Sequence, residues 1–145
     1  MKSLLIAVML SVPALAFAAD NVAKIKTLEG SAQVTRGDKA AALAEGDDVQ
    51  SGDVIRTASG ASLGLIFRDD TRLSLGPKST LVVDKMVFEP ATDDMEMSLL
   101  MKNGTFSVHA GQIAKLAPER TRLRIPSATL AIRGTSFLVE VDGDE

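Results

Sequence analysis

Residues 62–75 read SLGLIFRDDTRLSL, in which two apolar runs flank the polar segment 68–71. Large apolar residues occupy every second position of the first run, and Leu73 and Leu75 resume this spacing in the second. A period of two places alternate side chains on one face of a β-strand, whereas an amphipathic helix needs a period of about 3.6. The segment therefore predicts a hairpin, or two neighbouring strands around a corner.

The same alternation continues along the chain. Apolar residues alternate on both sides of Asn103-Gly104, a dipeptide that favours a tight turn because both positions of that turn need a positive φ. A second hairpin is therefore expected there. Further alternating runs cover residues 123–125, 130–132 and 137–141.

Helical signals are weak. Single turns are expected within residues 40–45 and 110–118, and residues 91–96 read as a polar loop. Glycine and aspartate punctuate the first half of the chain, and both residue types favour turns. Short strands at regular spacing indicate an all-β sandwich, barrel or solenoid, among which the period alone does not choose.

The first residues are predicted to be a secretory signal peptide, residues 1–18. Lys2 supplies a positive charge, residues 4–12 are almost wholly apolar, and Ala16 and Ala18 fit the small positions of a cleavage site. The apolar run is shorter than the roughly 20 residues that cross a bilayer. We expect cleavage after Ala18, one domain over residues 19–145 with no membrane span, and a periplasmic location, with an extracellular one as alternative.

Composition excludes several classes of function. The chain has no cysteine, which removes disulfides, a lipid-anchoring cysteine and cysteine-based metal sites. A net charge of -3 argues against nucleic acid as a partner. Five Phe with no Trp or Tyr leave few stacking platforms for sugars or bases. The Gly-Asp pairs lack the dense acidic spacing of a calcium loop, so we expect no metal and no cofactor.

One catalytic pattern occurs, but its context does not fit. Gly60–Gly64 matches G-x-S-x-G, and Asp84 and His109 follow in the order of an acid and a base. That mechanism needs a strained turn from a strand into a helix, whereas Ser62 lies in an alternating strand. We therefore expect no enzyme. His109, the only histidine, is expected to be an exposed strand-end residue, with pH sensing as an alternative.

A basic segment is the candidate partner-binding surface. Arg120, Arg122 and Arg124 alternate, so in a strand all three would project from one face, and Arg133 follows in the same segment. Such a row can hold an acidic partner, a phosphate-bearing glycan or an anionic headgroup. The alternative is a solvated strand face whose charges discourage edge pairing. Both interpretations remain open.

Several motifs together resemble the FecR domain, the periplasmic part of bacterial iron-citrate-type sensors and of many smaller envelope proteins. Residues 43–49 read LAEGDDV, residues 52–57 read GDVIRT and residues 132–137 read IRGTSF. The resemblance extends from about Val22 to Val141. It assigns turn-forming positions to Gly46, Asp47, Gly52, Asp53, Arg133, Gly134 and Thr135. One departure is Asp69-Asp70, where the family usually has Asp-Gly, so a differently shaped turn is expected.

The resemblance implies short strands stacked as a β-helix or solenoid, with a β-sandwich as alternative. It also implies binding rather than catalysis, through contact with an envelope protein partner in signalling or assembly. An open strand edge or the arginine row would make this contact, and the same edge would allow a homo-oligomer. A glycan or small-ligand binding module and a purely structural stack stay open as alternatives.

Overall fold

The computed structural model describes residues 21–130, 132 and 134–142. The expected signal peptide and Arg133 lie outside this range. The strands are β1 (Asn21–Glu29), β2 (Ala32–Arg36), β3 (Lys39–Ala42), β4 (Asp48–Gln50), β5 (Val54–Thr57), β6 (Ser62–Phe67), β7 (Arg72–Leu75), β8 (Thr80–Glu89), β9 (Asp94–His109), β10 (Thr121–Ile125), β11 (Ala128–Leu130) and β12 (Ser136–Val141). Helical structure is confined to α1 (Gln112–Leu116) and the 3-10 turns η1 (Pro90–Thr92) and η2 (Pro118–Arg120). The all-β prediction is confirmed.

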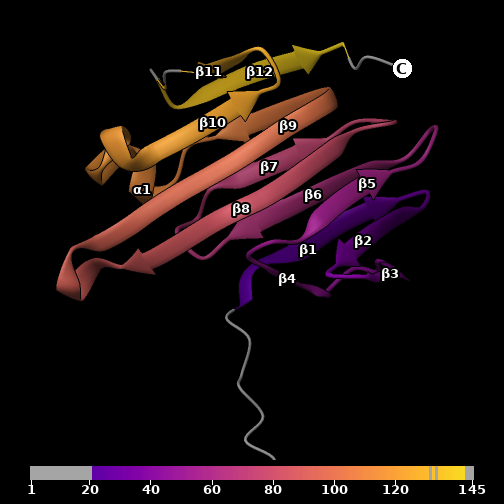
Figure 1. Ribbon diagram of the computed structural model, residues 1–145, viewed down its shortest axis with the longest axis horizontal. Coiled ribbons are helices and arrows are strands. Elements are labelled where there is room, and N and C mark those ends of the chain that lie inside the picture. Colours follow the sequence, from indigo (N-terminus) through magenta and orange to yellow (C-terminus); the bar gives the residue numbers. More distant parts are fainter. Residues whose placement is uncertain (1–20, 131, 133, 143–145) are drawn as a thin grey trace, which may run out of the picture.

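The strands form one sheet that curls into a half-barrel (Figure 1). Its order is β3-β2-β5-β8-β9-β7-β6-β1-β4, with β10 and β12 also paired to β9, and β11 paired to β10. The pairs are antiparallel apart from β10 with β9. A solenoid stacks successive coils in parallel, and the described strands do not form such a stack. The expectation of a β-helix is therefore replaced by an antiparallel curled sheet.

β9 joins the two parts of the sheet. Its first part pairs with β8 and β10, and its last six residues pair with β12 and, in part, with β7. The strands connected to the first part of β9 are named the β8 half; they are β2, β3, β5, β8, β10 and β11. The strands connected to the last part of β9 are named the β7 half; they are β1, β4, β6, β7 and β12. Both halves direct apolar side chains into one core.

The hairpin expected at Asn103-Gly104 is wrong, because both residues lie inside β9. Gly104 has a φ of 107°, so its backbone does take the positive φ that the dipeptide favours. Here that conformation bends one continuous strand where it changes neighbours. A Cβ at Gly104 would overlap Ser79, so the close approach of the β7–β8 connection also requires glycine.

The hairpin predicted for residues 62–75 is confirmed. β6 and β7 pair antiparallel, with Leu63 opposite Leu75 and Leu65 opposite Leu73. Asp70 in the connecting turn takes the left-handed conformation, with a φ of 68°, which glycine adopts most easily. Aspartate is among the residues that tolerate this region, because its short side chain can form local hydrogen bonds.

Two of the weak helical signals have different outcomes. The turn expected within residues 40–45 is wrong, because Lys39–Ala42 forms β3 and pairs with β2. The turn expected within residues 110–118 is confirmed as α1. Residues 91–96 close the β8–β9 hairpin, with η1 in its tip and β9 beginning at Asp94.

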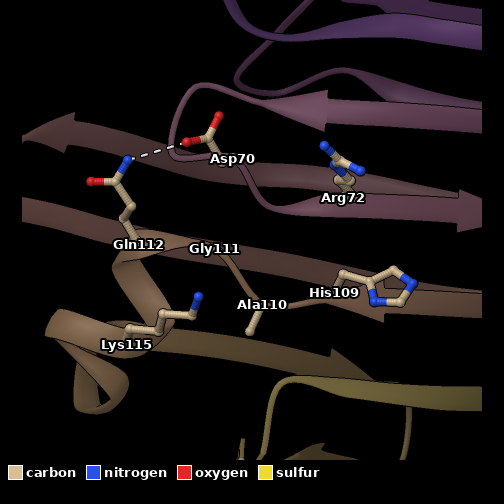
Figure 2. A pocket seen from close by; sticks show the side chains of 7 residues that line it. All are labelled: Asp70, Arg72, His109, Ala110, Gly111, Gln112 and Lys115. Carbon is tan, nitrogen blue, oxygen red and sulfur yellow. Dashed lines mark hydrogen bonds between the residues drawn. The ribbon is translucent and has the colours of Figure 1, made fainter.

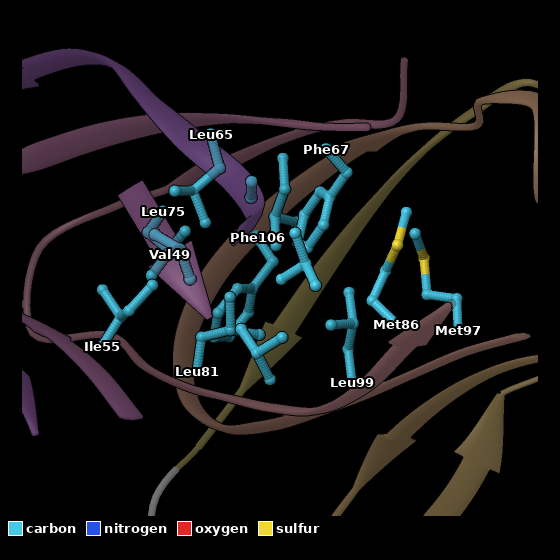
Figure 3. Packing of buried hydrophobic residues seen from close by; sticks show 14 of the residues in the cluster. Val49, Ile55, Leu65, Phe67, Leu75, Leu81, Met86, Met97, Leu99 and Phe106 are labelled. Atoms are coloured by element: carbon cyan, nitrogen blue, oxygen red, sulfur yellow. The ribbon is translucent and has the colours of Figure 1, made fainter. Parts of the chain in front are cut away.

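The core explains how the chain folds without disulfides. Phe106, Leu81 and Leu99 are fully buried, and Met86 and Met97 lie side by side at one end of the cluster (Figure 3). Burial of one large apolar side chain contributes about 1.5–3 kcal/mol relative to leaving it exposed. The alternating residues of both halves therefore supply a continuous hydrophobic core.

Replacement of Gly104 tests the bend. We expect Gly104→Ala to lower the free energy of unfolding by about 3 kcal/mol or more, because it adds both backbone strain and overlap with Ser79. Gly37 is the matched control, since its φ is 61° but a Cβ there would meet nothing within 4 Å. Gly37→Ala should cost only about 1 kcal/mol. Urea denaturation measures both, and equal losses would show that the contact with Ser79 is unimportant.

Candidate functional site

Asp53, one of the turn-forming positions, holds the connection between β4 and β5. Its side chain is 0% exposed and accepts a forked pair of hydrogen bonds from Arg36 Nε (2.9 Å) and Nη2 (2.8 Å). It also accepts a bond from the Gln50 backbone N–H (2.8 Å). The hydrogen bond with Asp53 raises the pKa of Arg36 above its usual value. A buried carboxylate with these partners is satisfied, so the structure gives Asp53 a role in fixing the corner.

The other turn-forming positions lie at separate corners of the sheet. Gly46 and Gly52 take positive φ values of 89° and 91°, and Asp47 accepts a hydrogen bond from the Ala44 backbone N–H (2.8 Å). Gly134 has a φ of 93°, and the Thr135 carbonyl accepts a bond from the Ala110 N–H (2.7 Å). These residues are therefore spread over several turns rather than gathered around one cavity.

The basic segment does not form the expected row of three. Arg122 and Arg124 occupy alternate positions of β10, but Arg120 belongs to η2, before the strand begins. Pro118 starts that 3-10 turn, which sequence alternation alone does not reveal. Arg120 donates a hydrogen bond to the Asp93 carbonyl (2.7 Å), and Arg124 pairs with the Asp84 carboxylate. Arg122 is exposed and forms no ion pair with any residue that the structure describes.

Carboxylates on the neighbouring strands partly neutralise this surface. The pKa of Glu96 on β9 is lowered, first by a hydrogen bond from Lys85 and to a smaller extent by the charges of Arg122 and Arg120. Lys85 Nζ lies 2.9 Å from Glu96 Oε2. The outer face of β8, β9 and β10 therefore carries interleaved charges of both signs, with Arg122 as its unpaired arginine among the described residues.

The residues of the G-x-S-x-G pattern do not form a catalytic site. His109 lies opposite Arg72 at one end of β7, and Ser62 begins β6 beyond the other end of that strand. Asp84 belongs to the β8 half and pairs with Arg124. Within the described part of the chain, no three acidic or histidine side chains lie close enough together to hold a metal ion.

A second buried carboxylate fixes the segment that follows β9. Asp69 is fully buried and accepts hydrogen bonds from the Thr71 hydroxyl (2.8 Å) and from the Ile113 backbone N–H (3.1 Å). The Gln112 N–H donates to the Asp69 carbonyl (2.8 Å). A Cβ at Gly111 would overlap Asp69 and Thr71, so the two segments are in direct contact. This clamp holds α1 beside the turn between β6 and β7.

The clamp forms one wall of a polar pocket. The pocket has a volume of about 390 Å³ and is lined by Asp70, Arg72, His109, Ala110, Gly111, Gln112 and Lys115. Figure 2 shows Lys115 on one side of Ala110, and Arg72 and His109 on the other. His109 also lies 2.6 Å from the Ser136 hydroxyl through Nδ1. His109 has no other histidine in the sequence, and the pairing of β7 with β9 brings it beside Arg72.

Removal of the Asp53 carboxylate tests its role. Asp53→Ala should lower the free energy of unfolding by about 3 kcal/mol, because it leaves a guanidinium and a backbone N–H without their buried acceptor. Asp48→Ala is the control, since the Asp48 side chain forms an exposed ion pair with Lys24 at 3.7 Å, and the bond from Arg36 to the Asp48 carbonyl is kept in the variant. Its loss should be within about 0.5 kcal/mol. Thermal and urea unfolding compare the two, and similar losses would contradict a buried lock at Asp53.

Comparison with known proteins identifies the family. The longest helix of the described residues has five residues, and none has the length and hydropathy of a membrane-crossing helix. No curated protein and no solved structure matches the chain significantly. A family model described as FecR protein matches residues 53–145, more than half of the chain, and includes the pocket and β5–β12. The chain therefore belongs to the FecR family.

Proposed function

We propose that this chain is a non-enzymatic binding domain of the bacterial envelope, exported to the periplasm, which contacts a protein partner in signalling or assembly. The partner adds a strand to the free edge of β12. Membership of the FecR family supports a binding role. The main observation in support of the proposal is that β12 is an edge strand with an exposed leucine in its middle.

Among the strands that the structure describes, β12 pairs with β9 alone, along one side. It has six residues, with Phe137 and Val139 half-buried and Leu138 71% exposed. It contains no proline and no lysine, the residues with which proteins commonly protect an edge. Its unpaired backbone groups are therefore a template for another strand, and an exposed leucine lies in the middle of that template.

The other described edges are less suited to strand addition. β4 and β11 have three residues each. β3 has four residues, begins with Lys39 and otherwise consists of alanines. Short strands and edge lysines are common protective devices. β12 is thus the longest edge strand among those described, and Glu140 is its one charged residue.

In strand addition, main-chain hydrogen bonds give affinity and side-chain contacts give selectivity. Leu138 would pack against an apolar residue of the added strand. Arg122 would favour a partner with an acidic surface, because its charge is not paired within the described residues. Arg120 and Arg124 contribute less to this selectivity, since each already has an acidic or carbonyl partner.

A charge placed on the edge tests strand addition. We expect Leu138→Lys to weaken partner binding by about tenfold or more, because an edge lysine opposes strand pairing. Leu116→Lys is the matched control, since Leu116 is 62% exposed on α1, away from the edge. A photo-cross-linker at Glu140 on β12 captures the partner in intact cells, and mass spectrometry identifies the cross-linked protein.

The outcomes separate the alternatives. Capture of one envelope protein that is lost in Leu138→Lys and retained in Leu116→Lys would support the proposal. If only a second copy of this chain were captured, the β12 edge would be a site of self-association and not of partner binding. Equal effects of the two lysines would exclude the β12 edge as the binding surface.

The contribution of Arg122 is tested separately. With the purified partner, Arg122→Gln should lower affinity by about two- to fivefold and reduce its dependence on salt, because the residue acts through an exposed charge. Lys26→Gln removes an equally exposed charge from β1 and should have little effect. Surface plasmon resonance at two salt concentrations measures both variants. An unchanged salt dependence in Arg122→Gln would remove this arginine from the interface.

A further inference from the structure

We propose that the pocket between β7, β9 and α1 binds the phosphate group of a small phosphorylated ligand. The pocket is distinct from the free edge of β12, on which the proposed function rests. Its cationic or titratable residues come from separate elements: Arg72 from β7, His109 from the end of β9 and Lys115 from α1.

The three residues line one pocket because the fold places their elements together. Arg72 and His109 are direct neighbours in the pairing of β7 with β9. Lys115 is brought to the opposite side of Ala110 by the Asp69 clamp, which fixes the start of α1 (Figure 2). The hydrogen bonds of Asp69 fix the backbone at the start of α1, so Lys115 is anchored on the same pocket as Arg72 and His109.

The charges of the pocket are available to a ligand. Arg72 and Lys115 form no ion pair with any residue in the described ranges. Asp70 is the acidic residue in the lining, and its carboxylate accepts a hydrogen bond from the Gln112 side chain (3.3 Å). Two basic residues thus line the pocket together with one carboxylate that already has a partner, and His109 adds a ring nitrogen, since its Nδ1 is the one beside Ser136.

Phosphate matches this set better than a single carboxylate does. A phosphate monoester carries a charge of about −1.5 to −2 near neutral pH and offers three acceptor oxygens. Arginine binds such oxygens through its planar fork, and lysine contributes a point charge. A volume of about 390 Å³ is within the range of small-molecule sites and leaves room for the organic part of the ligand.

The experiment titrates the isotope-labelled protein with glycerol phosphate and records amide chemical shifts by NMR. Glycerol is the uncharged control, and succinate provides two carboxylates. We expect saturable shifts confined to residues 70–72 and 109–115 with glycerol phosphate, at concentrations below about 10 mM, and none with glycerol. Arg72→Gln and Lys115→Gln should each weaken binding by about tenfold. Lys39→Gln, an exposed lysine on β3, should leave binding unchanged.

Three results would overturn the proposal. The first is the absence of saturable shifts in a protein whose spectrum shows that it is folded. The second is an equal loss of affinity in Lys39→Gln, which would indicate attraction by overall charge rather than a site. The third is equal affinity for succinate and glycerol phosphate, which would reject the phosphate assignment. The NMR spectrum of each variant shows whether that variant is folded. Asp70→Asn removes the negative charge of the pocket and should therefore bind glycerol phosphate more tightly.

Discussion

The contact between Gly104 and Ser79 is the constraint on which the sheet depends. β9 is the strand that has partners in both the β8 half and the β7 half, and it changes partners at Gly104. The positive φ of Gly104 turns the strand, and the missing side chain lets the β7–β8 connection approach. The bend allows one strand to present Leu99 and Phe106 to the same core although they lie in different parts of the sheet.

Two buried carboxylates fix the positions of loops, as the hydrophobic core fixes the positions of the strands. Asp53 ties the β4–β5 corner to Arg36, and Asp69 ties the segment after β9 to the β6–β7 turn. An unpaired buried charge would be costly, and each carboxylate has several donors that remove this cost. The chain has no cysteine, so these polar contacts fix loop positions that small exported domains often fix with disulfides.

Sequence reasoning succeeded where a local pattern reports directly on burial. The alternation in residues 62–75 predicted β6 and β7 because one face of each strand is buried. The prediction of a hairpin at Asn103-Gly104 failed because a tight turn and a bend within a strand both need a positive φ. The close contact of Gly104 with Ser79, which marks the bend, is not visible in the local sequence. The pocket was not predicted either, because Arg72 and Lys115 come to line it through strand pairing and the Asp69 clamp, neither of which has a signature in the local sequence.

The one-sided pairing of β12 has a consequence for the motions of the protein. Detachment of this strand breaks its ladder with β9 and exposes Phe137, Val139 and the core residue Val141, whereas detachment of β8 or β9 would expose a larger part of the core. Local opening is therefore expected to cost less free energy at β12 than at β8 or β9, and backbone amides of β12 should exchange with solvent before those of these two strands. Opening of β12 would also uncover the edge of β9 with which this strand pairs.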